Sequence, residues 1–306
     1  MLDIAIHLLV LFIYPPLLLG FIAKTKAAVA GRSGPPVLQP YYDLAKLLRK
    51  GAVYSRTTTW LFRAGPIASL AAVISAGLLL PLASSTAPLG FAGDVIAFAY
   101  VLAVARFFTM AAALDVGSSF EAMGASREAT FGALAEPALF VVLAILAVSA
   151  RSVGFSDIFG AHQFFSWDAT YAVFIVSAIA LFAVLLAENS RVPVDDPATH
   201  LELTMIHEVM VLDHGGVDLA FILYGAAMKL FLFATLLVRL VFPMGGRGLG
   251  ESLLILLGGT LTVAIAIGVV ESVMARFRLV RVPQFLIGAF VLAAVGLAVL
   301  FHRGIP

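Results

Sequence analysis

The feature that most constrains this chain is a series of apolar runs, each roughly 20 residues long. A run of that length with few charges is typical of a helix that crosses a lipid bilayer, where every backbone polar group must be paired within the protein. Only 12% of the 306 residues are charged, whereas globular proteins average about 25%. The sequence therefore predicts an all-α, polytopic integral membrane protein with about eight transmembrane helices.

Eight spans can be drawn along the chain from this periodicity. They run from Leu2 to Ala23, Pro66 to Leu82, Asp94 to Leu114, Glu128 to Ser149, Trp167 to Ala187, Val217 to Phe242, Ser252 to Ala275 and Pro283 to His302. The first run has no basic segment before it, so it is interpreted as a retained span rather than a signal peptide. No internal repeat or linker rich in Gly, Ser and Pro is visible, which favours a single membrane domain over residues 1–306.

Lysine and arginine predict the orientation, because cytoplasmic loops carry an excess of both. Most lie in the first loop, between Lys24 and Arg63, and in the last loop, which fall on the same side of an eight-span chain. The opposite side has Arg151, Arg239, Arg247 and Arg303. We therefore expect a multi-pass protein of the cell inner (plasma) membrane, with both termini outside and the odd-numbered loops in the cytoplasm.

The stretch between the fifth and sixth spans, residues 187–216, is unusually acidic for a connector. Pro193 and Pro197 prevent a continuous helix through its first half. An acidic, proline-broken segment between spans must contact water or line a polar site. Its six acids are therefore candidates to line such a site, and with the resemblance described below they are predicted to belong to a proton path: Glu188, Asp195, Asp196, Glu202, Glu208 and Asp213.

Ionisable residues within the spans are further candidates, because a charge inside a bilayer is costly and its default interpretation is functional. Glu128 and Glu136 are separated by roughly 12 Å along a helix, so they can line one polar track but cannot share one proton directly. With Lys229, deep in the sixth span, they complete the predicted path. The open alternative is a structural ion pair, such as Lys229 with one of these carboxylates, and a structural role is favoured for Glu271.

Several kinds of site are excluded by residues that the sequence lacks. No cysteine is present, which excludes disulfides and iron–sulfur clusters held by this chain's own thiolates. His200, His207 and His214 would lie about 10 Å apart along a helix, too far to ligate one metal. We therefore predict no metal, no cofactor and no catalytic residue in this chain. No basic cluster interleaved with aromatics appears, so no nucleic acid is expected.

The first loop contains a short amphipathic helix after Pro40. Tyr41, Leu44, Leu47 and Leu48 recur at helical spacing, and charged residues fill much of the rest. Two interpretations stay open for this element. It is a basic anchor at the membrane surface, which composition favours, or it is a docking or substrate-entry element.

Motifs along nearly the whole chain, taken in order, resemble one family of membrane subunits. Arg32-Ser33-Gly34-Pro35 with Leu38-Gln39-Pro40, Asp43 and Lys46-Leu47 is similar to the first cytoplasmic loop of the complex I subunit that bridges the peripheral and membrane arms. The family's third loop and fourth span are similar to Gly124-Ala125-Ser126-Arg127-Glu128 followed by Glu136-Pro137. Its Arg-x-Pro-Phe-Asp run resembles Arg191-Val192-Pro193-Val194-Asp195, with Val194 in place of Phe. Its basic seventh loop resembles Arg276-Phe277-Arg278. The length and the Gly-Ala-Ser-Arg-Glu-Ala run look most like the formate hydrogenlyase subunit 4 group, the membrane anchors of group 4 nickel–iron hydrogenases.

The resemblance implies an eight-helix subunit with no cofactor of its own. It implies partners on the cytoplasmic face, namely a hydrogenase-like large subunit with a NiFe centre and a small subunit with iron–sulfur clusters, and antiporter-like subunits in the lipid bilayer. The family has an acidic route into the membrane, and the matching positions here are Glu136, Glu188, Asp195 and Glu202. This chain has Ala198 and His200 where the family usually has glutamates.

Charge gathered on one side of an otherwise apolar chain, together with the resemblance, predicts a docking face for a soluble partner. Its candidate residues are Arg32, Asp43, Lys46, Arg49, Arg127, Arg191, Arg276 and Arg278. We expect a non-catalytic subunit of an oxidoreductase complex that anchors the redox arm and links it to proton translocation. The alternative is a stand-alone proton-coupled secondary transporter that uses Glu136 and Lys229. Such transporters often show inverted repeats, and none is visible here.

The predicted topology can be tested by cysteine labelling, because the natural chain has no cysteine to interfere. Single cysteines at Ser55 and Ser190 should react with a membrane-impermeant reagent only from the cytoplasmic side. A cysteine at Ser156 should react only from outside. Labelling of Ser55 and Ser156 from the same side would contradict the eight-span topology.

Overall fold

The computed structural model describes residues 2–160, 169–195, 205–242 and 244–302, and within these ranges the chain is helical with no strand. This confirms the predicted all-α class. The helices in chain order are α1 (Leu2–Ile13), α2 (Pro15–Val29), α3 (Gln39–Leu48), α4 (Trp60–Leu79), α5 (Asp94–Asp115), α6 (Ser119–Ala150), α7 (Phe155–Gly160), α8 (Ala169–Glu188), α9 (His207–Met210), α10 (Gly216–Val241), α11 (Leu249–Val273), the 3-10 helix η2 (Leu279–Arg281) and α12 (Val282–His302).

Seven of the described helices are long and apolar enough to cross a membrane, and the count rises to eight if α1 and α2 form one bent span. The first span was predicted as one run from Leu2 to Ala23, but α1 and α2 meet at a 44° bend. The bend falls at Tyr14, directly before Pro15 and Pro16. Proline has no N–H for the helical ladder, and its ring clashes with the preceding turn, which accounts for the break.

The fourth span also differs from its predicted start at Glu128. Helix α6 begins at Ser119 and runs for 32 residues, so the Gly124–Glu128 motif lies inside the helix rather than at its beginning. A side chain at Gly124 would meet Val209 Cγ1 at 2.3 Å and the Ile206 carbonyl at 2.9 Å. The early turns of α6 are therefore covered by residues 205–210 of the same chain.

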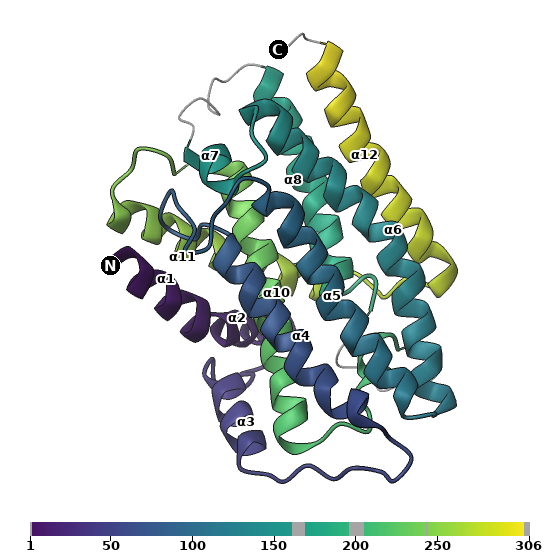
Figure 1. Cartoon of the computed structure of the whole chain (residues 1–306). Helices are drawn as coiled ribbons and strands as arrows, with labels where there is room; N and C mark the ends of the chain where they lie inside the picture. The colour runs from purple at the N-terminus through teal and green to yellow at the C-terminus, as the bar shows by residue number, and fades with distance from the viewer. Residues whose placement is uncertain (1, 161–168, 196–204, 243, 303–306) are drawn as a thin grey trace.

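Helix α10 is the centre of the bundle. It packs against α2, α3, α4, α8 and α11, and most of its side chains are buried. Around it, α4 pairs with α5, while α6, α8 and α12 pack together and α11 packs on α2 (Figure 1). The surface helices expose large apolar side chains along their outer faces, as expected for helices that meet lipid.

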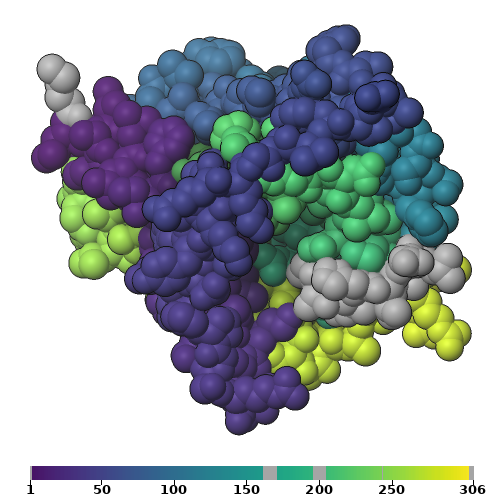
Figure 2. All heavy atoms as spheres, turned by 90° about the horizontal axis from the view of Figure 1, so that it is seen from below, coloured from purple at the N-terminus to yellow at the C-terminus, as the bar shows by residue number. Residues whose placement is uncertain are grey.

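Side-chain contacts bring the first, third, fifth and seventh loops to one end of the bundle. Asp115, at the end of α5, accepts hydrogen bonds from Thr59 N at 2.7 Å and from Thr59 Oγ1 at 2.8 Å. Arg276, in the seventh loop, pairs with Asp195 at 2.8 Å. Figure 2 shows this end, with α3 and the first loop in dark purple-blue beside the green 205–216 segment. The predicted grouping of the odd-numbered loops is therefore present in the fold, and we call this end of the bundle the loop face.

Candidate functional site

Arg106 joins three helices within the bundle. It projects from α5, and its guanidinium binds Glu136 through Nη1 and Glu188 through Nη2. Its Nε lies 3.4 Å from Glu128 Oε1. Glu128 and Glu136 both belong to α6 and are too far apart to share a proton, so Arg106 spans the gap that helix geometry leaves between them.

Lys229 extends this group of charges to the central helix. From α10, its Nζ lies 2.8 Å from Glu188 Oε2. The sequence left open which carboxylate would pair with Lys229, and the structure assigns it to Glu188. We call Arg106, Lys229, Glu128, Glu136 and Glu188 the ion-pair network.

The network is buried unevenly. The side chains of Arg106 and Glu188 are 9% and 3% exposed, whereas that of Glu136 is 36% exposed. With every group ionised, three carboxylates face two cations, which leaves one excess negative charge. The excess is largest where Glu136 approaches the protein surface, because Glu188 is the carboxylate that both cations share.

A glycine makes room for the arginine at the centre of the network. A side chain at Gly132, one turn before Glu136 on α6, would meet Arg106 Nη1 at 2.4 Å and Cζ at 2.9 Å. The guanidinium therefore lies close to the α6 backbone at Gly132, within reach of both Glu128 and Glu136. Close packing of α5 on α6 at this glycine fixes the geometry of the network.

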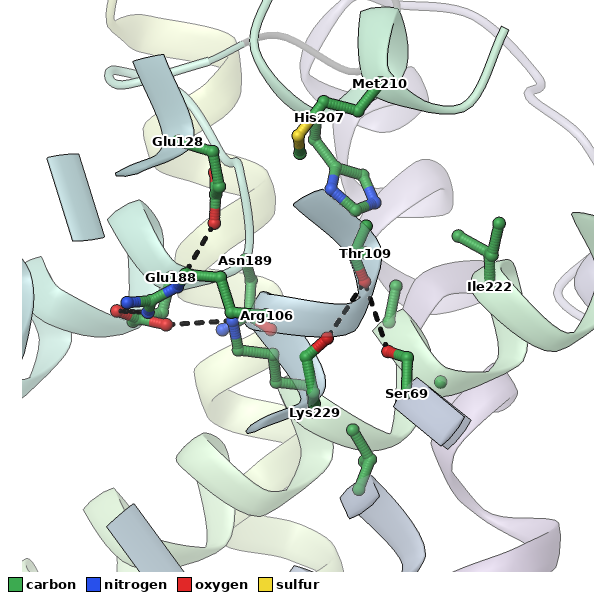
Figure 3. Close-up of a pocket in the computed structure, with 14 residues that line it drawn as sticks. Ser69, Arg106, Thr109, Glu128, Glu188, Asn189, His207, Met210, Ile222 and Lys229 are labelled. Atoms are coloured by element: carbon green, nitrogen blue, oxygen red, sulfur yellow. Dashed lines mark hydrogen bonds and ion pairs between the residues drawn. The ribbon is translucent and has the colours of Figure 1, made fainter. Parts of the chain in front are cut away.

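A cavity of about 70 Å³ adjoins the network (Figure 3). It has room for a few water molecules, since each water needs roughly 10–15 Å³ of such cavity space, counted at the positions open to the water's centre. Its polar lining includes hydroxyl, amide and imidazole groups as well as network residues. The polar lining residues are Ser69, Arg106, Thr109, Glu128, Glu188, Asn189, His207 and Lys229.

A second group of charges fixes the connector that follows α8. Asp195 pairs with Arg276 through Oδ1, and its Oδ2 accepts hydrogen bonds from Ile206 N at 3.1 Å and His207 N at 3.2 Å. Phe277 N donates to the Pro193 carbonyl at 2.8 Å. We call Asp195, Arg276 and these backbone contacts the Asp195 clamp. It joins the fifth loop to the seventh loop and to the start of α9.

Glu271 forms a third charged contact at the same end. Lys26 Nζ lies 2.9 Å from its Oε2 and Arg191 Nη1 lies 3.3 Å from its Oε1. Its side chain is fully buried, so the structural ion pair that was favoured for this residue is present. The contact ties α2 and the fifth loop to the end of α11.

Several predicted path residues lie apart from the network. Glu208 and Asp213 do not line the cavity, and the backbone N–H of Asp213 donates to Glu121 Oε1 at 3.2 Å. Asp196 and Glu202 lie outside the described residues. His214 is buried, and its ring stacks on Phe62 with centroids 3.9 Å apart. Burial lowers the pKa of His214, and the charges of Asp218 and Asp213 oppose that shift.

The predicted docking residues divide into two groups. Arg32, Asp43, Lys46, Arg49 and Arg278 are exposed. Arg127, Arg191 and Arg276 are half-buried and bind other parts of the chain, as Arg127 Nη1 does when it donates to the Met205 carbonyl at 2.8 Å. These three arginines hold the fifth loop in place, so the exposed group is the better candidate for contact with a partner.

Two residues of the site were not among the predicted path residues. Arg106 lies in the third predicted span, and the cost of a charge inside a bilayer is the signal that could have found it. His207 was considered only as a metal ligand. Within the described residues, no group of three or more His, Cys, Asp or Glu side chains is arranged to hold a metal ion.

Comparison with known proteins identifies relatives over almost the full chain. The sequence model of a family described as NADH dehydrogenase matches residues 2–302. Formate hydrogenlyase subunit 4 of Escherichia coli (strain K12) is 32% identical over 286 residues, which cover 91% of this chain and 92% of the relative. Hydrogenase-4 component C of the same organism is 29% identical over 291 residues, which cover 93% and 91%.

A more distant relative and a solved structure extend the comparison. A subunit of the NADH-quinone oxidoreductase of Anaplasma marginale (strain St. Maries) is 25% identical over 243 residues, which cover 73% of this chain and 67% of the relative. A chain in the structure of the membrane-bound sulfane sulfur reductase, an archaeal respiratory membrane complex, superposes with a TM-score of 0.80. At 22% identity, with 97% of this chain and 98% of that chain covered, this match shows a shared fold.

The network predicts a large difference between two acid-to-amide substitutions. Glu188→Gln removes the carboxylate that both cations share, and breaking a buried pair in this way destabilises a fold by about 3–5 kcal/mol. Glu251→Gln disrupts the exposed Arg247–Glu251 pair, which should matter little. Thermal unfolding in detergent should show a clearly lower midpoint for Glu188→Gln alone. Equal midpoints for the two variants would contradict the structural weight given to Glu188.

Proposed function

Since this chain belongs to the NADH dehydrogenase family, the family of complex I subunit 1, we propose that it anchors and couples the two parts of a complex I-like redox complex. In this role it docks a peripheral redox arm and links that arm to proton translocation in the membrane. The similarity to formate hydrogenlyase subunit 4 and hydrogenase-4 component C favours a complex of the membrane-bound group 4 nickel–iron hydrogenase type.

The observation that carries the proposal is the partial exposure of Glu136 on an apolar helix face. Its side chain is 36% exposed, while the neighbouring surface of α5 and α6 presents Tyr100, Phe107 and Phe140. A carboxylate at membrane depth is costly against acyl chains, so such groups face protein or a water-filled space. This face therefore fits a neighbouring membrane subunit that covers Glu136 and receives the charge it carries.

The other half of the bundle supports a lateral route rather than a direct one. Beyond Lys229, the residues of α10 from Leu230 to Val238 are buried and almost all apolar. Arg239 follows them, buried, with hydrogen bonds to the carbonyls of Pro81 and Ser84. Apolar packing and a buried cation both oppose proton passage straight through this chain. We therefore expect a proton that reaches the network to leave laterally, at Glu136.

The partners follow from the family and from the exposed loops. The proposed complex contains a hydrogenase-like large subunit with a NiFe centre and a small subunit with iron–sulfur clusters on the loop face. It also contains antiporter-like subunits beside α5 and α6. This chain holds no cofactor of its own in the proposal, and the residues described include no cluster suited to a metal. The loop face is cytoplasmic, in an inner-membrane protein whose termini lie outside.

A stand-alone transporter is the less favoured function. Two relatives that match more than 90% of this chain are described as a subunit and a component of larger enzymes. The network also opens toward a lateral face rather than across the bundle. Both observations favour a coupling subunit.

The role of Glu136 can be tested with Glu136→Gln, which keeps the side-chain shape and removes the charge. In membrane vesicles, the variant complex should assemble and keep its redox activity with an artificial electron carrier. Its proton translocation should fall by at least about tenfold, because general acid–base groups contribute factors of that size or more. The measurement is vesicle acidification at a matched redox rate.

Two controls sharpen this test. Glu251→Gln changes an exposed glutamate outside the network and should translocate protons normally. Loss of assembly in Glu136→Gln would instead favour a structural ion pair between Glu136 and Arg106. Normal translocation in Glu136→Gln would remove Glu136 from the proton path.

The docking face predicts a salt-dependent interaction through its exposed cations. Replacing Arg32, Lys46 and Arg49 together with alanine should lower the salt concentration at which half of the peripheral subunits dissociate, by about twofold. Exposed charges at an interface mainly tune association rate and salt sensitivity. Arg247→Ala, an exposed arginine in the connection between α10 and α11, is the matched control. Unchanged dissociation of the triple variant in a salt titration in mild detergent would refute the assignment of this face.

A further inference from the structure

His207 lies between two charged groups that the proposed function does not yet connect. Its imidazole lines the cavity beside the ion-pair network, and Figure 3 shows the ring directed toward that cavity on the side of Thr109. Its backbone N–H is held by Asp195 at 3.2 Å. The residue is half-buried, so part of it remains accessible to solvent.

The ring itself is available for proton exchange. Across the described ranges, no hydrogen bond joins either imidazole nitrogen to another protein group, whereas the network carboxylates are all engaged by cations. Histidine is the side chain whose charge changes most readily near neutral pH, and its two nitrogens can accept and donate a proton at once. A cavity with room for water supplies the second partner in such a transfer.

We propose that His207 transfers protons from the loop face to the ion-pair network, an inference that rests on the proposed coupling function. One imidazole nitrogen takes a proton from water at the loop face. The other nitrogen releases its proton to water in the cavity, and a cavity water passes a proton to a network carboxylate. Rotation or tautomer exchange of the neutral ring then restores the starting state, so protons and charge balance.

We assign Glu128 as the acceptor, because Arg106 holds it at the longest distance of the network carboxylates. Its side chain is 15% exposed and lines the same cavity, and its distance from Arg106 Nε, 3.4 Å, is the longest contact in the network. The charged groups that face the cavity from the packed helices are Arg106 of α5, Glu128 of α6, Glu188 of α8 and Lys229 of α10. Two carboxylates and two cations therefore face the cavity that His207 also lines.

The Asp195 clamp gives this transfer a connection to the docking face. The carboxylate that holds His207 N also pairs with Arg276 of the seventh loop. Two positions after Arg276, Arg278 is exposed. A displacement of the seventh loop by a bound partner therefore moves Asp195 and, with it, the backbone that carries the imidazole.

The test uses His207→Ala and His207→Gln in the complete complex in membrane vesicles. Both variants should keep redox activity with an artificial electron carrier and lose proton translocation by at least about tenfold. Added imidazole should restore part of the translocation to His207→Ala, because a small diffusing base replaces a proton-transfer group but does not repair a packing defect. The same base should not rescue Glu136→Gln, whose lost carboxylate an imidazole in the cavity does not replace.

The outcomes separate this inference from the proposed function. His302→Ala changes an exposed histidine at the end of α12 and is the control for nonspecific effects. Normal translocation by His207→Gln, with Glu136→Gln defective, would overturn the His207 proposal and leave the coupling function standing. Normal translocation by Glu136→Gln and His207→Gln would overturn both. If His207→Ala fails to assemble, His207→Gln decides the question, because it retains the volume and hydrogen-bonding capacity of the ring.

Discussion

The structure depends on one buried guanidinium. Arg106 binds carboxylates from α6 and α8, and through Glu188 it is joined to Lys229 of α10. Removing such charges from water costs several kcal/mol for each ion, and apolar residues of similar volume would often stabilise the same helices as well or better. The network is therefore poorly explained as a device for stability. In the proposed function, the network is a set of groups whose protonation changes as the complex works.

The connector after α8 brings this network close to the protein surface. Glu188 ends α8 inside the network, and Asp195, seven positions later, lies in the clamp with Arg276. Between them, Arg191 is fixed to Glu271, which in turn binds Lys26 of α2. Both ends of this short segment are held by ion pairs. A movement of the seventh loop therefore also displaces the segment. In the proposed function, a partner bound at the loop face changes the surroundings of Glu188 and His207 through this segment.

The sequence predicted the elements better than their contacts. Runs of apolar residues set by the thickness of a bilayer locate the spans, and the odd-numbered loops meet at one end as their charges indicated. The bend at Tyr14 was signalled by Pro15 and Pro16 but was not drawn. The pairing of Lys229 with Glu188, and the central place of Arg106, could not be predicted because they depend on the rotation of four helices about their own axes. Apolar residues surround these helices so broadly that hydrophobic periodicity does not fix that rotation.

The excess of carboxylates suggests how the network handles one proton. Arg106 touches Glu128 on the cavity side and Glu136 on the apolar face, while Glu188 keeps both cations. One carboxylate can therefore be neutral without leaving a cation unpaired. In the proposed function, protonation of Glu128 loosens its contact with Arg106 and strengthens the hold on Glu136, whereas protonation of Glu136 does the reverse. A single guanidinium that shifts between these two carboxylates makes proton uptake on one side favour release on the other.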